Sequence, residues 1–107
     1  MKVYVAGPYT KPDPCINTYE AVKVGDELVA LGHTPYIPHL SHFWHTMSPK
    51  AYDWWLKYDL EWLDVCDIVL RLPGKSPGAD KEVEFAETHG IPVVHSVRDV
   101  GIGVDYV

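Results

Sequence analysis

The segment 76–86 constrains the fold of this chain more than any other. It follows the continuous apolar run 68–72, typical of a buried strand, and its proline and glycine predict a loop that opens a helix. Glu82 falls on the apolar stripe of that helix, which occupies positions 79, 82, 83 and 86. Because an unpartnered buried carboxylate is costly, Glu82 must reach a polar cleft or a partner. We interpret Glu82 as the centre of a functional site. The alternative is a Glu that only stabilises the first turn of the helix.

A second carboxylate interrupts an apolar face in the helix predicted from Tyr52 to Cys66. Asp59 shares one helical face with five apolar or aromatic residues: Tyr52, Trp55, Leu56, Leu60 and Leu63. Asp is also unfavourable in the middle of a helix, because its side chain competes for backbone hydrogen bonds. Two inward carboxylates on consecutive helices are compatible with a salt-bridged structural arrangement. They are equally compatible with an acid/base or nucleophile/orienter pair.

The composition is that of a small globular protein with an acidic balance. At 107 residues, with 47% apolar and 22% charged residues, the chain fits one domain with a single core. The net charge of −6 argues against a nucleic acid polymer or an anionic membrane as the main partner, and no apolar run has the length of a membrane span. The chain leads directly into a strand rather than a signal peptide, and Cys15 and Cys66 lack metal-type spacing. We expect free thiols in a reducing compartment and a cytoplasmic location.

Strand and helix patterns alternate along the chain. Strands are predicted at 2–6, 34–37, 67–72 and 91–94, with a weak fifth at 100–107. Helices are predicted from Asn17 or Thr18 to Leu31, over 52–66, and from the 76–79 loop to Gly90, whereas 38–49 is expected to be a loop. The alternation indicates one α/β domain over 1–107. Its fold class is a Rossmann-like or flavodoxin-like parallel sheet of four to five strands with helices on both faces.

Ligands of such sheets bind beyond the carboxyl ends of the strands, near the point where the strand order reverses. Three segments are expected to gather at this edge: Gly7-Pro8-Tyr9, the loop after Ile37, and 72–82. The polar residues of the chain therefore converge on one cleft, which favours the functional interpretation of Glu82. Arg71 lies at the ligand end of the third strand, and we expect it to pair with Asp67 or Asp80. The alternative is contact with a phosphate or carboxylate of a ligand.

The loop after Ile37 is rich in histidine and aromatic residues. It holds His39, His42 and His45, but no carboxylate or Cys accompanies them in a known metal-binding pattern, so we predict no metal and no cofactor. Phe43, Trp44 and Trp54 or Trp55 fit a wall that stacks on a nucleobase. For each of these aromatic residues, packing in the core or at an oligomer interface is the alternative.

Three motifs in order resemble the nucleoside 2-deoxyribosyltransferase superfamily, and more narrowly a group of small phage and bacterial proteins within it. These are Tyr4-Val5-Ala6-Gly7-Pro8, Asp59-Leu60 ahead of Cys66-Asp67, and 76–86 followed by Gly90-Ile91-Pro92-Val93. The resemblance covers the chain from about Val3 to Val94. It implies a nucleoside or nucleotide as the small-molecule partner, Glu82 as nucleophile and Asp59 as the assisting residue.

Two positions depart from the transferases of this superfamily. Ser76 stands where they carry an Asp, and Glu84 stands where many members have Gly. Ser76-x-Gly78 instead resembles the deoxynucleoside 5′-monophosphate N-glycosidases of the same superfamily, in which that Ser helps to hold the phosphate. The substrate-binding residues that we expect are Gly7, Pro8, Tyr9, His42, Trp44, Ser76 and Gly78.

The predicted chemistry is cleavage of an N-glycosidic bond, which a nearby carboxylate assists by stabilising or trapping an oxocarbenium-like centre. Glu82 near a helix N-terminus is expected to stay ionised, with Asp59 bonding the sugar or relaying a proton to the base. Both a hydrolase and a transferase remain open, and the alternative is a catalytically inactive nucleotide-binding or sensor module on the same fold.

A homo-oligomer, a dimer or larger, is expected because four Trp and seven Tyr exceed what one small core buries. The family resemblance also implies association, with active-site residues shared between neighbours.

Overall fold

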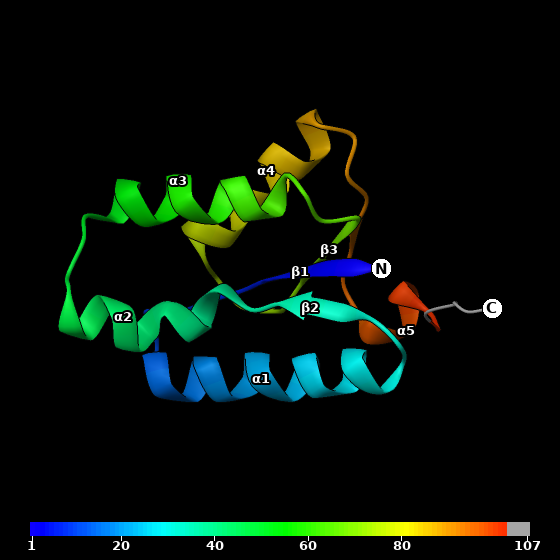
Figure 1. Cartoon of the computed structure of the whole chain (residues 1–107), viewed down its shortest axis with the longest axis horizontal. Helices are drawn as coiled ribbons and strands as arrows, with labels where there is room; N and C mark the ends of the chain where they lie inside the picture. Colours follow the sequence, from blue (N-terminus) through cyan, green and yellow to red (C-terminus); the bar gives the residue numbers. More distant parts are fainter. Residues whose placement is uncertain (103–107) are drawn as a thin grey trace.

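The structure of the chain, a computed structural model, describes residues 1–102. Its elements alternate along the chain (Figure 1): β1 (Lys2–Ala6), α1 (Pro14–Ala30), β2 (Thr34–Tyr36), the short 3-10 helix η1 (Pro38–Ser41), α2 (His42–Met47), α3 (Tyr52–Leu63), β3 (Ile68–Arg71), α4 (Pro77–Thr88), β4 (Val93–Val94) and α5 (Val97–Val100). The strands form one parallel sheet in the order β2-β1-β3-β4. The prediction of a flavodoxin-like α/β fold is confirmed.

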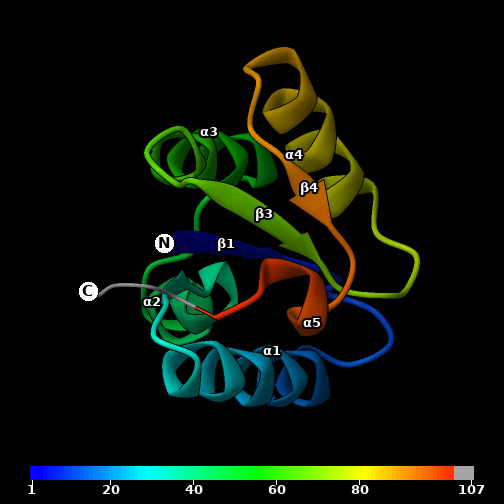
Figure 2. The same cartoon turned by 90° about the vertical axis from the view of Figure 1, so that its right-hand side faces the viewer.

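Successive residues of β1 and β3 face opposite helix layers, as the pleat of a strand requires. On one face, Val3, Val5, Ile68 and Leu70 pack against α1 and α5, through Ala21, Leu28 and Val100. On the other face, Tyr4, Ala6 and Val69 pack against α3 and α4, through Leu63, Ala79 and Ala86. Figure 2 shows the sheet between these two layers, with α3 and α4 above it and α1 and α5 below. Both faces are covered, so the strands are continuously apolar.

The helix boundaries differ from prediction at the start of α1. Asp13 caps this helix, and its carboxylate accepts hydrogen bonds from the backbone N–H groups of Cys15 and Ile16. Proline at the first helical position removes a donor that would have no partner there, so Asp13-Pro14 is a stronger start signal than the predicted Asn17 or Thr18. The Asn17 side chain instead donates to the carbonyls of Tyr9 and Lys11, which holds the loop after β1.

Two further expectations change with the structure. The segment 38–49, predicted as a loop, is mostly helical, because η1 and α2 follow each other directly. The weak fifth strand at 100–107 lies largely outside the described residues, and Val100, its first residue, ends helix α5. None of the helices described in residues 1–102 is both long and apolar enough to span a membrane.

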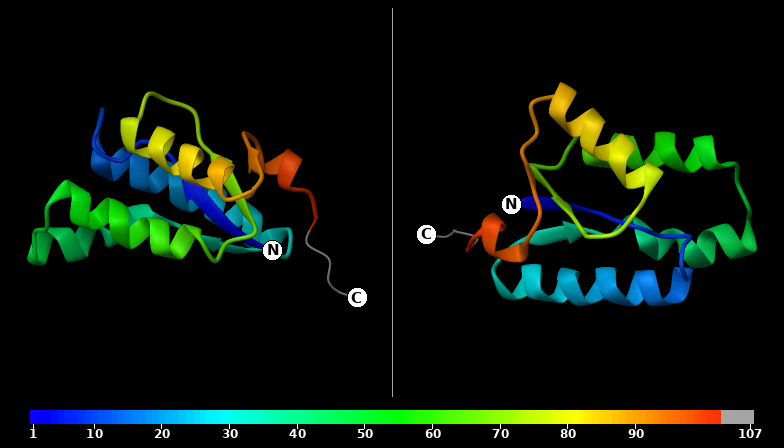
Figure 3. Two further views of the ribbon diagram at one scale, coloured as in Figure 1. Left: turned by 90° about the horizontal axis from the view of Figure 1, so that it is seen from above. Right: turned by 180° about the vertical axis from the view of Figure 1, so that it is seen from behind.

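The carboxyl ends of β1, β2 and β3 share one edge of the sheet, and the strand order reverses between β1 and β3. Gly7 allows the loop after β1 to lie against the loop after β3, since a Cβ on Gly7 would lie 2.9 Å from the Leu72 Cβ. Helices α3 and α4 run side by side over one face (Figure 3), and their first turns approach closely. A Cβ on Gly78 would lie 3.3 Å from the Tyr52 hydroxyl oxygen. This edge is where a ligand is expected.

Candidate active site

A cavity of about 850 Å³ opens at this edge of the sheet. Its walls come from the loop after β1, from η1 and α2, from the first two turns of α3, and from the start of α4. The predicted site residues that line it are Gly7, Pro8, Tyr9, Asp59, Ser76, Gly78 and Glu82. His42 and Trp44 do not line it. Segments far apart in the sequence therefore meet at one cavity.

Glu82 is the buried carboxylate of this cavity, with an exposed fraction of 7%. Its Oε2 atom accepts a hydrogen bond of 2.6 Å from the hydroxyl of Tyr4, a fully buried residue of β1. The ion pairs among residues 1–102 join Lys23 to Glu20 and Arg71 to Asp80, so Glu82 is not paired with a cation there. The predicted Arg71–Asp80 pair is confirmed, at 3.0 Å. Glu82 is thus held by a neutral donor.

Asp59 reaches the same cavity from α3. Its Oδ1 atom is buried and has no hydrogen-bond partner among the described residues. Burial raises the pKa of Asp59 to about 7, because the charged form loses its hydration without gaining a partner. A buried, unpartnered carboxyl oxygen is costly in a purely structural role, so Asp59 is available for a ligand.

Burial also raises the pKa of Glu82, to about 8, and the negative charge of Asp59 adds to this effect. The Tyr4 hydrogen bond and the charge of Arg71 act in the opposite direction but do not outweigh burial. The expectation that the helix N-terminus keeps Glu82 ionised is therefore wrong at neutral pH. Desolvation of a carboxylate costs more than the helix dipole contributes.

The contribution of Tyr4 was missed in the sequence analysis. Tyr4 stands between Val3 and Val5 in an otherwise apolar strand, and a buried tyrosine usually needs a hydrogen-bond partner for its hydroxyl. That requirement is the signal that predicts a polar partner on the α3–α4 face. Tyr36, its neighbour on β2, stacks on Tyr4 with ring centroids 5.6 Å apart and on Trp62 at 5.5 Å. The stack fixes the Tyr4 ring, and with it the Glu82 carboxyl.

The three histidines of 38–49 have separate partners. His39 is buried and lines the cavity, and its Nε2–H donates to the carbonyl of Pro8 at 2.9 Å, which leaves the buried Nδ1 without a partner. Burial lowers the pKa of His39, so its neutral form is favoured and Nδ1 is an acceptor. His42 is hydrogen-bonded to the Tyr9 hydroxyl, and His45 accepts a hydrogen bond from the Trp55 indole. Over residues 1–102 no group of three or more His, Cys, Asp or Glu side chains is arranged to hold a metal ion.

The aromatic residues predicted to form a stacking wall divide between the cavity and a neighbouring cluster. Trp55 lines the cavity. Trp44 instead packs edge-on against Trp54, Trp55 and Tyr58, with ring centroids 5.2 to 5.7 Å apart. The Trp44 ring is therefore part of this aromatic cluster and not of the cavity lining.

Ser76 has a local role as well as a place on the cavity wall. It caps α4, since its hydroxyl oxygen accepts a hydrogen bond of 3.1 Å from the backbone N–H of Ala79. Four lysines also line the cavity, Lys11, Lys50, Lys75 and Lys81. Lys75 and Lys81 adjoin Ser76 in the sequence, whereas Lys11 and Lys50 come from distant segments, so their place in this lining could not be predicted.

Comparison with known families identifies the chain over most of its length. Residues 1–96 match the model of a family described as a domain of unknown function (DUF7768). The chain belongs to this family. No curated protein matches the DUF7768 chain. Among solved structures, it is similar to the 2-deoxyribosyltransferase of the psychrotolerant bacterium Bacillus psychrosaccharolyticus, at 25% identity and a TM-score of 0.61. The match covers 87% of the DUF7768 chain and 69% of the transferase chain.

The cavity of this DUF7768 domain combines groups with complementary chemistry. Glu82 and Asp59 can hold one negative charge and one proton between them, because burial raises the pKa of both carboxyls. His39 offers a hydrogen-bond acceptor, Trp55 an apolar face, and the lysines positive charge at the rim. Such a site can bind an anionic, partly aromatic small molecule and can exchange a proton with it.

Proposed function

We propose that the chain cleaves or transfers the N-glycosidic bond of a (deoxy)nucleoside or nucleoside 5′-monophosphate, as a member of the nucleoside 2-deoxyribosyltransferase superfamily. The observation that carries the proposal is that two carboxyls line one cavity, the buried Glu82 held by Tyr4 and the half-buried Asp59, whose Oδ1 has no partner among the described residues. The similarity to a 2-deoxyribosyltransferase supports a nucleoside as the substrate class. The sequence motifs around Glu82 and Asp59 support it independently.

In the proposed reaction the ionised Glu82 attacks the anomeric carbon of the sugar. A C–O bond forms to the carboxylate, the C–N bond to the base breaks, and its electron pair leaves with the base. Asp59, whose pKa of about 7 leaves it partly protonated near neutral pH, supplies the proton that the departing nitrogen takes up. Because the pKa of Glu82 is the higher of the two, the reactive form, with Glu82 ionised and the proton on Asp59, is the minor one. Water or a second base then attacks the same carbon, its proton passes to the Asp59 carboxylate left by the first step, and the C–O bond to Glu82 breaks, which gives a hydrolase or a transferase respectively.

Tyr4 has a positioning role in this proposal. Its hydroxyl donates to Oε2 of Glu82 and so stabilises the ionised form that attack requires. The rigid stack of Tyr4 on Tyr36 limits the directions that the carboxyl can adopt. His39 and Trp55 are proposed to receive the base, since an acceptor nitrogen and an aromatic face suit its N–H groups and its ring.

Incubation with a panel of nucleosides and nucleoside 5′-monophosphates, with and without an acceptor base, tests the proposal. Release of free base supports a hydrolase, and base exchange that needs the acceptor supports a transferase. The protonated state favoured for Glu82 at neutral pH is the observation behind a second candidate, an inactive nucleotide-binding module. Binding of a nucleotide without base release at any pH from 6 to 9 would favour that second candidate.

The phosphate form of the substrate is proposed to bind better than the nucleoside. Ser76 and the N-terminal N–H groups of α4 adjoin the cavity, and such groups hold anions. We expect Ser76→Ala to narrow the affinity gap between a monophosphate and its nucleoside, and to cost about 1 kcal/mol of stability through the lost cap. Ser76→Thr keeps both the hydroxyl and the cap and serves as the control. Calorimetric titration that finds equal affinity for the two wild-type ligands would refute the phosphate preference.

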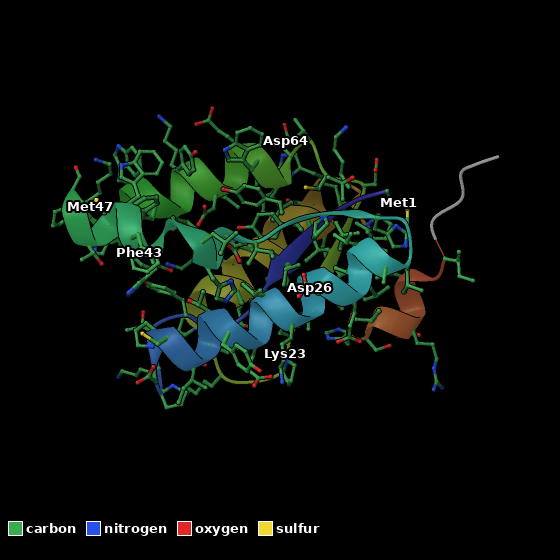
Figure 4. The ribbon with its side chains drawn as sticks, turned by 60° about the horizontal axis from the view of Figure 1, so that its bottom comes forward. Met1, Lys23, Asp26, Phe43, Met47 and Asp64 are labelled. Carbon is green, nitrogen blue, oxygen red and sulfur yellow. The ribbon has the colours of Figure 1, made fainter. Side chains whose placement is uncertain are left out.

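The chain is also proposed to form a twofold dimer through the exposed apolar end of α2. Phe43 and Met47 are 71% and 82% exposed, and Figure 4 shows them at the end of the molecule opposite Met1. Sedimentation at micromolar concentration is expected to give twice the chain mass of 12.1 kDa. Phe43→Glu with Met47→Glu is expected to give the monomer, whereas Tyr19→Glu on α1, which is 61% exposed, leaves the dimer intact. A wild-type monomer would exclude this assembly.

A further inference from the structure

Four lysines line the cavity beside the carboxyls of Asp59 and Glu82. Lys11, Lys50, Lys75 and Lys81 all line it, out of nine Lys and Arg residues in a chain of net charge −6. None of the four belongs to an ion pair among residues 1–102. Lys50 and Lys81 lie over the rings of Trp54 and Tyr52, with the ammonium nitrogens 4.8 and 5.1 Å from the ring centroids. A cluster of lysines on an acidic chain indicates an anionic ligand with more than one charge.

A second cavity, of about 660 Å³, adjoins the first and shares part of its wall. The shared residues are Pro8, Lys11 and Lys75, and the remaining wall is formed by Pro12, Asn17, Pro73 and Gly74. Its lining thus contains two lysines and no carboxylate. Lys11 and Lys75 line both cavities, so a ligand that extends from one cavity to the other passes both residues.

The two loops that carry these lysines are braced against each other. Gly74 has a φ of 114°, and a Cβ there would lie 2.8 Å from Cγ of Pro8, so the loops meet at this point. On one side, the side-chain amide of Asn17 donates hydrogen bonds to the carbonyls of Tyr9 and Lys11. On the other side, Arg71 donates to the carbonyl of Gly74 at 3.1 Å. The backbone at the junction is therefore fixed before a ligand binds, which lowers the cost of binding.

We propose that the junction of the two cavities binds a diphosphate, so that the ligand carries at least two linked phosphates rather than one. The inference rests on the proposed function for the position of the sugar, which lies beside Glu82 in the first cavity. From there the 5′ substituent extends past Ser76 to Lys11 and Lys75, and the second phosphate enters the second cavity. Nucleoside 5′-diphosphates, triphosphates and dinucleotides joined by a pyrophosphate share this chemistry.

Inorganic phosphate and inorganic pyrophosphate are the first probes, titrated calorimetrically against the whole chain at low salt. Neither contains a glycosidic bond, so the result does not depend on the proposed reaction. We expect pyrophosphate to bind about tenfold or more tightly than phosphate, with the difference reduced at high salt. Equal affinity of the two anions would overturn the inference, even if base release from a monophosphate is observed.

Charge-removing variants locate the binding. Lys11→Met and Lys75→Met keep most of the side-chain length, and each is expected to weaken pyrophosphate binding about tenfold. Lys23→Met is the matched control, because Lys23 lies on the outer side of α1 (Figure 4) and pairs with Glu20 away from both cavities. Pyrophosphate binding that Lys11→Met and Lys75→Met leave unchanged would also overturn the inference.

A series of nucleotides with the same base then shows which class of molecule carries the linked phosphates. A mono-, di- and triphosphate series and a pyrophosphate-linked dinucleotide are compared for affinity with the Glu82→Gln protein, in which turnover is expected to be absent. If the nucleoside diphosphate binds most tightly, the binding site ends within the second cavity. If the triphosphate or the dinucleotide binds most tightly, the site accepts a longer ligand. Preference for the monophosphate would refute the inference and leave the proposed function intact.

Discussion

Glu82→Gln is expected to lower the rate of base release by three or more orders of magnitude. Gln has nearly the same shape as Glu, and its amide oxygen can accept the hydrogen bond that Tyr4 donates to Oε2 in the native chain. The packing of α4 on the sheet is therefore preserved. What is lost is the carboxylate that attacks the sugar. Base release measured by chromatography, with single-turnover kinetics for any residual activity, gives the magnitude.

The matched control for this variant is Glu84→Gln. Glu84 lies two residues along α4 and is exposed, so its substitution makes the same change of side chain on the same helix without touching the cavity. Wild-type activity of Glu84→Gln with loss of activity in Glu82→Gln supports the assignment. A folded Glu82→Gln protein that retains full activity would rule out Glu82 as the nucleophile.

The fold could be predicted because its signals are local. The apolar runs of β1 and β3, and the period of α3 and α4, each depend on a few neighbouring residues. The same periodicity predicted that Glu82 faces inward, and it does. The cap at Asp13 is equally local, since Asp13-Pro14 is a stronger helix-start signal than Asn17 or Thr18.

The partners within the site could not be predicted in this way. Tyr4 and Glu82 lie 78 positions apart, and their hydrogen bond depends on how α4 crosses β1. The basic lining of the cavity likewise unites lysines from three segments, around Lys11, around Lys50 and at Lys75 and Lys81, that no single sequence window contains. The protonation of Glu82 was missed because the helix dipole can be inferred from the sequence, whereas the depth of burial, which outweighs it, cannot.

The stability of the chain is expected to fall as the pH rises from 5 to 8, by about 3 kcal/mol from Glu82 alone. Burial raises the pKa of Glu82 in the folded state to about 8, whereas its ordinary value is 4.5. Over this range the folded state therefore binds the proton that the unfolded state releases, so rising pH favours unfolding. Asp59, whose pKa is raised to about 7, acts in the same direction. His39 opposes both below its ordinary pKa of 6.5, because its lowered pKa makes the folded state the poorer proton binder.

Comparison with Glu82→Gln isolates the contribution of Glu82, since Asp59, His39, Tyr4 and Arg71 remain in both proteins. Urea unfolding at pH 5, 6, 7 and 8 is expected to give similar free energies of unfolding near pH 5, where the native Glu82 is neutral like Gln. The variant should become the more stable protein by about 3 kcal/mol at pH 8. Parallel stability curves for the two proteins would show that Glu82 titrates alike in the folded and unfolded states.

The same pH range then bears on catalysis, because the proposed nucleophile must be ionised. Because Asp59 must at the same time keep the proton that it supplies, base release by the wild-type chain should follow a bell-shaped pH profile with its maximum between pH 7 and 8, the pKa values of the two carboxyls.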